Sequence, residues 1–275
     1  MRFNPKARLD TSRVRDRGRG GGGGGGLGTS AGGSLDDSRM ANSNRYASCQ
    51  TGADANSSSD CARVAVENSL YDYWSDALPA QSGADFEAEQ KVETFSGGIG
   101  TGCGQATAAV GPFYCPTDQT IYLDTTFFDD VLEQQLGGPD GAFVEPYVLA
   151  HEYGHHIQNL LGTMGKVKTQ QGPTSDSVRL ELQADCYAGM WAKAATTTED
   201  EDGNVLISEL NQQDVQQAID AATAVGDDRI QQQSGGGVDS DSWTHGSSQQ
   251  RVAWFTKGYQ SGSLDACDTF APGAL

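Results

Sequence analysis

Residues 151–155 read His-Glu-Tyr-Gly-His, the pattern H-E-x-x-H, within a run at 148–161 that is predicted to be a helix. Residues four positions apart lie on one face of a helix, so His151 and His155 can bind a single cation while Glu152 flanks the remaining coordination position. The pattern therefore predicts a zinc site that supports metal-assisted hydrolysis of a peptide bond.

A third protein ligand has to come from elsewhere, because catalytic zinc usually takes three and leaves the fourth position to water. The candidates are Glu181, Asp185, His156 and His245. His156 points about 100° away from the metal face, so we expect it to pair with a carboxylate or to line the cleft. Glu181 and Asp185 share one face of a second predicted helix. We assign Glu181 to the metal and Asp185 to the outer N–H of a ligating histidine, with the reverse assignment as the alternative.

The expected reaction gives a role to each polar group around the metal. Zinc lowers the pKa of its bound water from about 15.7 to roughly 7, and Glu152 acts as the general base that passes the proton to the leaving amine. His245 is a candidate hydrogen-bond donor to the oxyanion; its alternative role is to fix its own loop. Arg251 is expected to be an ion-pair partner rather than a substrate clamp.

The charge of the chain excludes one class of partner. The 275 residues contain 18 Lys and Arg against 37 Asp and Glu, a formal net charge of −19. Nucleic acid is excluded as a partner because its phosphates require a basic surface. The expected partner is a protein or peptide substrate, and we interpret the acidic residues as a solvated surface rather than a preference for basic substrates. The sequence leaves the oligomeric state open.

Six cysteines occur without any C-x-x-C spacing of the kind a structural zinc site would use. An even number with two closely spaced pairs indicates disulfides, although six cysteines allow fifteen arrangements. The simplest arrangement joins Cys49 to Cys61, Cys103 to Cys115, and Cys186 to Cys267. Disulfides indicate an extracytoplasmic protein, secreted or in the cell envelope; six reduced thiols in a cytosolic protein are the alternative.

The N-terminal segment, residues 1–45, is basic, contains an unbroken glycine run at 20–26 and has few large apolar side chains. Such a segment buries too little apolar surface to offset its chain entropy, so we predict that it is disordered and that the folded domain spans residues 46–275. It shows no apolar stretch of the length that a signal peptide or membrane span needs. Membrane association would therefore require a missing or external anchor.

Periodicity predicts an α+β fold. Helices are expected at 61–78, ended by Pro79, at 125–136, from about 145 to 161, from a cap at Thr174 or Ser175 to 195, from Ser208 to about 224, and at 247–258. Short β-branched and aromatic runs at 92–95, 113–115 and 120–123 predict a small antiparallel sheet. Residues 226–240, rich in Gly, Asp and Gln, are expected to form a loop.

Several segments together resemble the bacterial family of neutral zinc metallopeptidases, which are usually membrane-anchored. They are the Gly-rich N-terminus, GPFYCP at 111–116, IYLD at 121–124, HEYGHHIQ at 151–158, ELQADCYAG at 181–189, THGS at 244–247, QRV at 250–252 and WF at 254–255. The resemblance covers most of residues 40–265. This sequence departs from the family in one respect: the membrane helix that relatives often carry after the glycine run is missing here.

The resemblance implies a zincin-like domain, in which the sheet packs on the two motif helices and an edge strand over the cleft can bind substrate backbone. The E-x-x-A-D segment also resembles the glutamate-ligand motif of gluzincin peptidases, which supports Glu181 as the ligand. The alternative is a catalytically silent protein of the same fold that works as a binding or assembly factor of the cell envelope. The intact Glu152 favours the peptidase, because a binding protein needs no general base.

Overall fold

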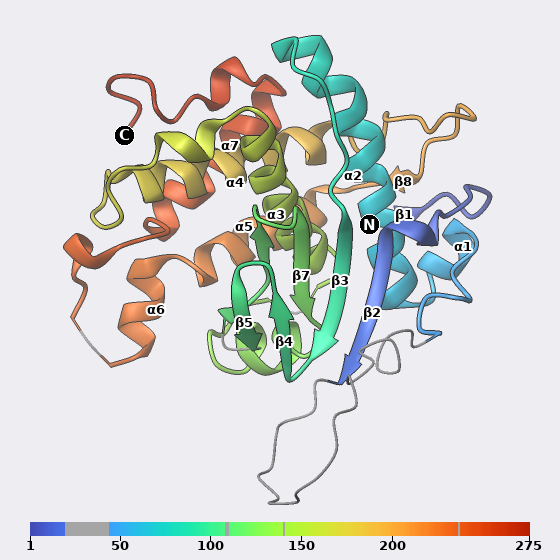
Figure 1. The fold of residues 1–275 in the computed structure, drawn as a ribbon, viewed down its shortest axis with the longest axis horizontal. Coiled ribbons are helices and arrows are strands. Elements are labelled where there is room, and N and C mark those ends of the chain that lie inside the picture. Colours follow the sequence, from blue (N-terminus) through green and yellow to red (C-terminus); the bar gives the residue numbers. More distant parts are fainter. Residues whose placement is uncertain (20–43, 108–109, 140, 236) are drawn as a thin grey trace, which may run out of the picture.

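The computed structural model describes residues 1–19, 44–107, 110–139, 141–235 and 237–275. A four-stranded sheet with the order β2-β3-β7-β6 lies at its centre (Figure 1). These strands are β2 (Val14–Arg19), β3 (Lys91–Ser96), β7 (Thr120–Asp124) and β6 (Phe113–Cys115). β2, β3 and β7 run parallel, and only β6 is antiparallel to its neighbour. The α+β class is confirmed; the prediction of an antiparallel sheet is right for β6 and β7 but wrong for β3, which pairs parallel to β7.

The sheet is covered on both faces, which explains its apolar composition. On one face, Val92 and Ile121 are paired across β3 and β7 and belong to the main hydrophobic core, together with the helices. On the other face, Phe95 and Tyr122 pack under the hairpin of β4 (Gly98–Thr101) and β5 (Gly104–Thr107). Figure 1 shows this hairpin in front of the sheet and the helices behind it.

The first 19 residues are part of the fold, so the prediction of disorder is wrong for them. β1 (Arg2–Phe3) pairs with β8 (Ile207–Glu209), and β2 pairs along β3. Phe3 and Val14 are buried in the main core. The composition of a segment does not reveal its partners, whereas here β8 and β3 pair with β1 and β2, and the main core buries Phe3 and Val14. The rest of the predicted disordered tail, residues 20–43, lies outside the described residues.

α2 (Ser59–Ser82) follows the short helix α1 (Gly52–Ala55) and crosses behind the sheet. Ser58 caps it by accepting a hydrogen bond from the Cys61 amide. The helix continues one turn beyond Pro79 and ends at Gly83, whose φ of 72° places it in the left-handed region. Pro79 therefore does not end the helix as predicted: it costs one hydrogen bond near the end of a long helix that is otherwise well packed.

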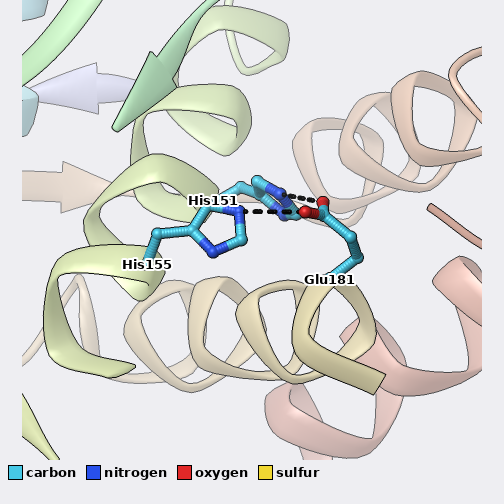
Figure 2. Close-up of side chains that lie close together, drawn as sticks. All are labelled: His151, His155 and Glu181. Atoms are coloured by element: carbon cyan, nitrogen blue, oxygen red, sulfur yellow. Dashed lines mark hydrogen bonds and ion pairs between the residues drawn. The ribbon is translucent and has the colours of Figure 1, made fainter. Parts of the chain in front are cut away.

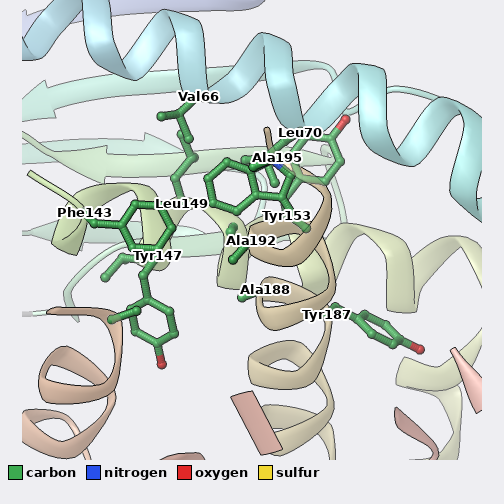
Figure 3. Close-up of a cluster of buried hydrophobic side chains, with 14 of the residues drawn as sticks. Val66, Leu70, Phe143, Tyr147, Leu149, Tyr153, Tyr187, Ala188, Ala192 and Ala195 are labelled. Atoms are coloured by element: carbon green, nitrogen blue, oxygen red, sulfur yellow. The ribbon is translucent and has the colours of Figure 1, made fainter. Parts of the chain in front are cut away.

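α3 (Val144–Leu160) and α4 (Asp176–Ala194) carry the two predicted motifs. Ser175 caps α4, in agreement with the prediction. Figure 3 shows apolar side chains of α2, α3 and α4 meeting in one core. Gly154 lies against Ala184 of α4, where an added Cβ would be 3.1 Å from the Ala184 backbone oxygen. The glycine within H-E-x-x-H thus permits the close approach of the two helices.

The C-terminal part adds α5 (Gln212–Ala224), α6 (Asp227–Gln233) and α7 (Ser248–Ser261). Asn211 caps α5, whereas Ser208, the predicted cap, lies in β8. Part of the Gly-rich loop predicted at 226–240 is helical, and the helix predicted at 125–136 is a π-helical turn at Phe127–Glu133. The capping box of Ser247 and Gln250 at the start of α7 is confirmed.

Three disulfides join Cys49 to Cys61, Cys103 to Cys115, and Cys186 to Cys267, which confirms the predicted pairing. The first ties the segment before α1 to α2, and the third ties α4 to the C-terminal segment. In the described part of the chain, no helix has the length and apolar character that crossing a membrane would require.

α4 and α7 make their close contact through two glycines. A Cβ on Gly258 would lie 1.8 Å from the backbone oxygen of Cys186, and a Cβ on Gly189 would lie 2.1 Å from that of Phe255. We expect Gly258→Ala to lower the free energy of unfolding by about 3 kcal/mol, because backbone atoms cannot move aside as a side chain can. Urea unfolding with the disulfides intact measures this. Gly165→Ala, which meets open space, serves as the control, and equal stability of the two variants would contradict the packing.

Candidate metal centre

The three predicted ligands, His151, His155 and Glu181, lie together between α3 and α4 (Figure 2). The two histidines project from α3 one turn apart, and Glu181 faces them from α4. His151 Nε2 lies 3.1 Å from Glu181 Oε2, and His155 Nε2 lies 3.5 Å from Glu181 Oε1. All three residues offer a ligand atom within 4.8 Å of the others.

This group fits zinc in both chemistry and spacing. Ligand atoms about 2.05 Å from a tetrahedral zinc lie about 3.3 Å apart, and each histidine Nε2 lies near that distance from one of the two Glu181 oxygens, at 3.1 and 3.5 Å. Two imidazoles and one carboxylate leave a fourth position free, as in catalytic zinc sites. Within the described ranges of the chain, no other group of three His, Cys, Asp or Glu residues is placed to hold a metal ion.

The electrostatics of the group favour positive charge. Burial alone would lower the pKa of His151, but the carboxylates of Asp185 and Glu181 outweigh it and raise that pKa to about 10. The pKa of His155 is also raised against burial, by Glu181. In turn, the imidazoles outweigh the effect of partial burial and hold the pKa of the Glu181 carboxyl well below its usual range. The same carboxylates would stabilise a bound divalent cation at this point.

Asp185 lies where the sequence predicts it, beside the outer nitrogen of a ligand. Its Oδ1 atom is 2.8 Å from His151 Nδ1 and also accepts a 2.6 Å hydrogen bond from the Tyr147 hydroxyl. Arg251, from α7, donates from Nε to Asp185 Oδ2 at 2.8 Å and from Nη2 to Oδ1 at 3.0 Å. Arg251 is thus an ion-pair partner, as expected. Asp185 is fully buried, and Arg251 compensates its charge.

Glu152 is buried beside the two histidines, 7 % exposed. Burial raises the pKa of its carboxyl, while the positive charge of His155 and His151 and a hydrogen bond from the Tyr114 backbone amide oppose the shift. Tyr114 belongs to β6, the outer strand of the sheet. The sheet edge therefore borders the site at the general-base candidate.

His245 lies between α6 and α7, with its imidazole half-exposed. Asp227, the first residue of α6, fixes its loop by accepting hydrogen bonds at Oδ2 from the backbone amides of Thr244, His245 and Gly246, at 2.7–3.0 Å. Asp227 Oδ1 also lies 3.4 Å from His245 Nδ1, and this contact raises the pKa of the imidazole. His245 is close enough to Glu181 for each charge to shift the pKa of the other.

His156 has neither of its expected roles. It is fully buried, with Nδ1 3.1 Å from the Tyr114 hydroxyl and Nε2 2.7 Å from the backbone oxygen of Glu87. Burial lowers the pKa of its imidazole, which favours the neutral ring, and the two contacts bridge β6 to the segment before β3. The correction follows from helix geometry: a side chain one residue beyond His155 faces the sheet rather than the metal.

Three residues near the centre escaped the sequence analysis: Tyr147, Gln158 and Asp227. Tyr147 precedes His151 by four positions and Gln158 follows His155 by three, so their helical spacing could have indicated that they contact the ligand side chains. Asp227 reaches His245 only through the tertiary structure, and nothing in its local sequence marks it.

Comparison with known proteins agrees with this site. Residues 6–270 match the family described as "Putative neutral zinc metallopeptidase". "Uncharacterized protein Rv2575" of Mycobacterium tuberculosis H37Rv is 50% identical over 229 residues, which cover 82% of this chain and 76% of the relative. "Uncharacterized protein YpfJ" of Escherichia coli K12 is 46% identical over 188 residues, covering 66% and 62%, respectively. No solved structure matches the chain. The chain belongs to the neutral zinc metallopeptidase family.

Proposed function

We propose that the protein is a zinc-dependent peptidase with a zincin-like catalytic domain, in which His151, His155 and Glu181 hold the ion. The observation that carries the proposal is the meeting of these three side chains with Glu152 beside them. When bound, zinc supplies an activated water molecule and polarises the scissile carbonyl. The test is metal analysis combined with digestion of a peptide library by the wild type and by Glu152→Gln.

Glu152 accepts the proton of the attacking water and delivers it to the leaving amine. Its burial supports this role, since a carboxyl whose pKa is raised toward neutrality can both take up and release a proton. Positive charge at the neighbouring histidines opposes that shift, and a bound zinc ion would oppose it in the same direction, so the carboxylate remains available as a base.

The substrate backbone lies along β6. This strand ends the sheet, so its outer edge can add the extended backbone of a peptide. The Tyr114 amide places that edge against Glu152, which supports a scissile bond positioned above the general base. This arrangement supports a peptide or protein as the substrate.

His245 stabilises the oxyanion as a protonated imidazole. We expect His245→Ala to lower kcat by about 10²–10³-fold, because a preorganised donor to the oxyanion is lost. Zinc content should not change, since the half-exposed ring is not among the three ligands. Steady-state kinetics together with metal analysis measures both quantities; loss of zinc in step with activity would contradict the role.

The pH dependence of kcat provides the control for the assignment of protonated His245 as the oxyanion donor. The hydrogen bond with Asp227 is the main cause of the raised pKa of His245. The protonated donor is lost as pH rises through that pKa, so Asp227→Asn should move the alkaline limb of the kcat profile to lower pH. An unchanged limb would assign His245 to the loop alone.

The three disulfides support a location outside the cytoplasm, where thiols oxidise and remain paired. The alternative is a catalytically silent binding or assembly factor. For such a protein, the metal analysis and peptide-library digest should find one zinc ion per chain and no cleaved peptide.

A further inference from the structure

A chain of buried side-chain amides links the second histidine ligand to the C-terminal segment. Gln158 Oε1 lies 2.8 Å from His155 Nδ1, and Gln158 Nε2 donates to Gln183 Oε1 at 3.1 Å. Gln183 Nε2 then donates to the backbone oxygen of Cys267 at 3.1 Å. Gln158 is fully buried and Gln183 is 5 % exposed, so water does not compete for these bonds.

Two backbone carbonyls fix the direction of every hydrogen bond in this chain. A carbonyl oxygen can only accept, so the groups facing Cys267 O and Leu180 O must be the NH₂ groups of Gln183 and Gln158. The Gln158 Oε1 atom is thereby left to accept from His155, which places the imidazole proton on Nδ1. The lone pair of His155 is then on Nε2, the atom that faces Glu181.

The two histidines are therefore held in different ways. His151 Nδ1 meets the carboxylate of Asp185, whereas His155 Nδ1 meets the neutral amide of Gln158. The outer end of the amide chain is anchored covalently, because Cys267 is joined by a disulfide to Cys186, which lies five residues after Glu181 on α4. The tautomer of one ligand thus depends on side chains that never approach the metal.

We propose that Gln158 and Gln183 are positioning residues of the zinc site, with Gln158 selecting the Nε2-binding tautomer of His155 and Gln183 holding Gln158 in that orientation. This inference rests on the proposed zinc site. A group that hydrogen-bonds the outer nitrogen of a ligating histidine typically contributes about 10–100-fold to metal affinity.

The experiment measures the zinc dissociation constant by chelator competition and records the Co²⁺ absorption spectrum of each variant. Gln158→Met, which keeps the volume and removes the acceptor, should weaken zinc binding about 10–100-fold and alter the Co²⁺ spectrum. Gln183→Ala should weaken binding by less, and adding it to Gln158→Met should cost little more, because Gln183 acts only through Gln158.

The matched control is Thr269→Val. Thr269 is fully buried and donates a 2.6 Å hydrogen bond to the backbone oxygen of Arg179, so it fastens the same C-terminal segment to α4 without contacting a ligand. Its zinc affinity should equal that of the wild type. Unchanged affinity in both Gln158→Met and Gln183→Ala overturns the inference while the zinc site stands. A wild type that binds no zinc overturns both. If Gln158→Met does not fold, Gln183→Ala alone decides.

Discussion

Glu152→Gln is expected to lower the turnover of peptide substrates by about 10²–10⁴-fold while one zinc ion per chain remains bound. The amide has nearly the shape of the carboxylate but cannot accept the proton of the attacking water. Zinc should stay because Glu152 is not one of the three residues whose ligand atoms converge. The variant therefore separates loss of chemistry from loss of the metal.

The measurement is kcat and KM on a peptide identified from the library, with zinc content determined on the same preparation. Glu209→Gln, which removes an exposed carboxylate in β8, is the control and should have wild-type activity. Full activity of Glu152→Gln would overturn the general-base mechanism. A parallel loss of zinc would show instead that Glu152 supports the metal.

Arg251→Met is expected to lower the free energy of unfolding by about 3–5 kcal/mol. Asp185 is fully buried, and Arg251 is the only cationic side chain that pairs with it among the described residues apart from His151. Removing the guanidinium leaves a buried carboxylate with too little compensation, and the attraction of Asp185 to His151 does not replace two charge-assisted hydrogen bonds. Zinc affinity should fall as well, because Asp185 orients His151.

Urea unfolding in the absence and presence of zinc measures both effects. The control combines Arg251→Met with Asp185→Asn: removing the second charge should recover part of the stability, since no uncompensated ion remains. If Asp185→Asn instead lowers the free energy of unfolding as much in the Arg251→Met background as it does in the wild type, the two residues are not coupled.

Features set by local spacing were predicted well. H-E-x-x-H places His151 and His155 on one face of α3. The four-residue spacing of Glu181 and Asp185 predicts that both side chains of α4 face that helix. The disulfides of Cys49 with Cys61 and of Cys103 with Cys115 each span 12 residues, so spacing alone indicated them. Caps at Ser175 and Ser247 follow from the same local chemistry.

Features that depend on partners distant in sequence were missed. The composition of residues 1–19 predicts disorder, yet β2 gains its hydrogen bonds from β3, more than 70 positions later. The predicted direction of pairing was wrong for β3 and β7, because alternation within a single strand carries no information about the direction of its neighbour. The role predicted for His156 was wrong because its actual partners, Glu87 and Tyr114, are distant in sequence and come near it only in the folded chain.

By itself, the sequence determined which side chains can hold zinc and act as a base, because helix geometry converts a spacing of four residues into a shared face. Only the tertiary structure decided how those side chains are oriented. The Arg251 contact with Asp185, the amide chain from His155 to Cys267 and the Asp227 contact with His245 all join separate elements. The first two form because packed helices exclude water and leave buried polar groups only one another as partners.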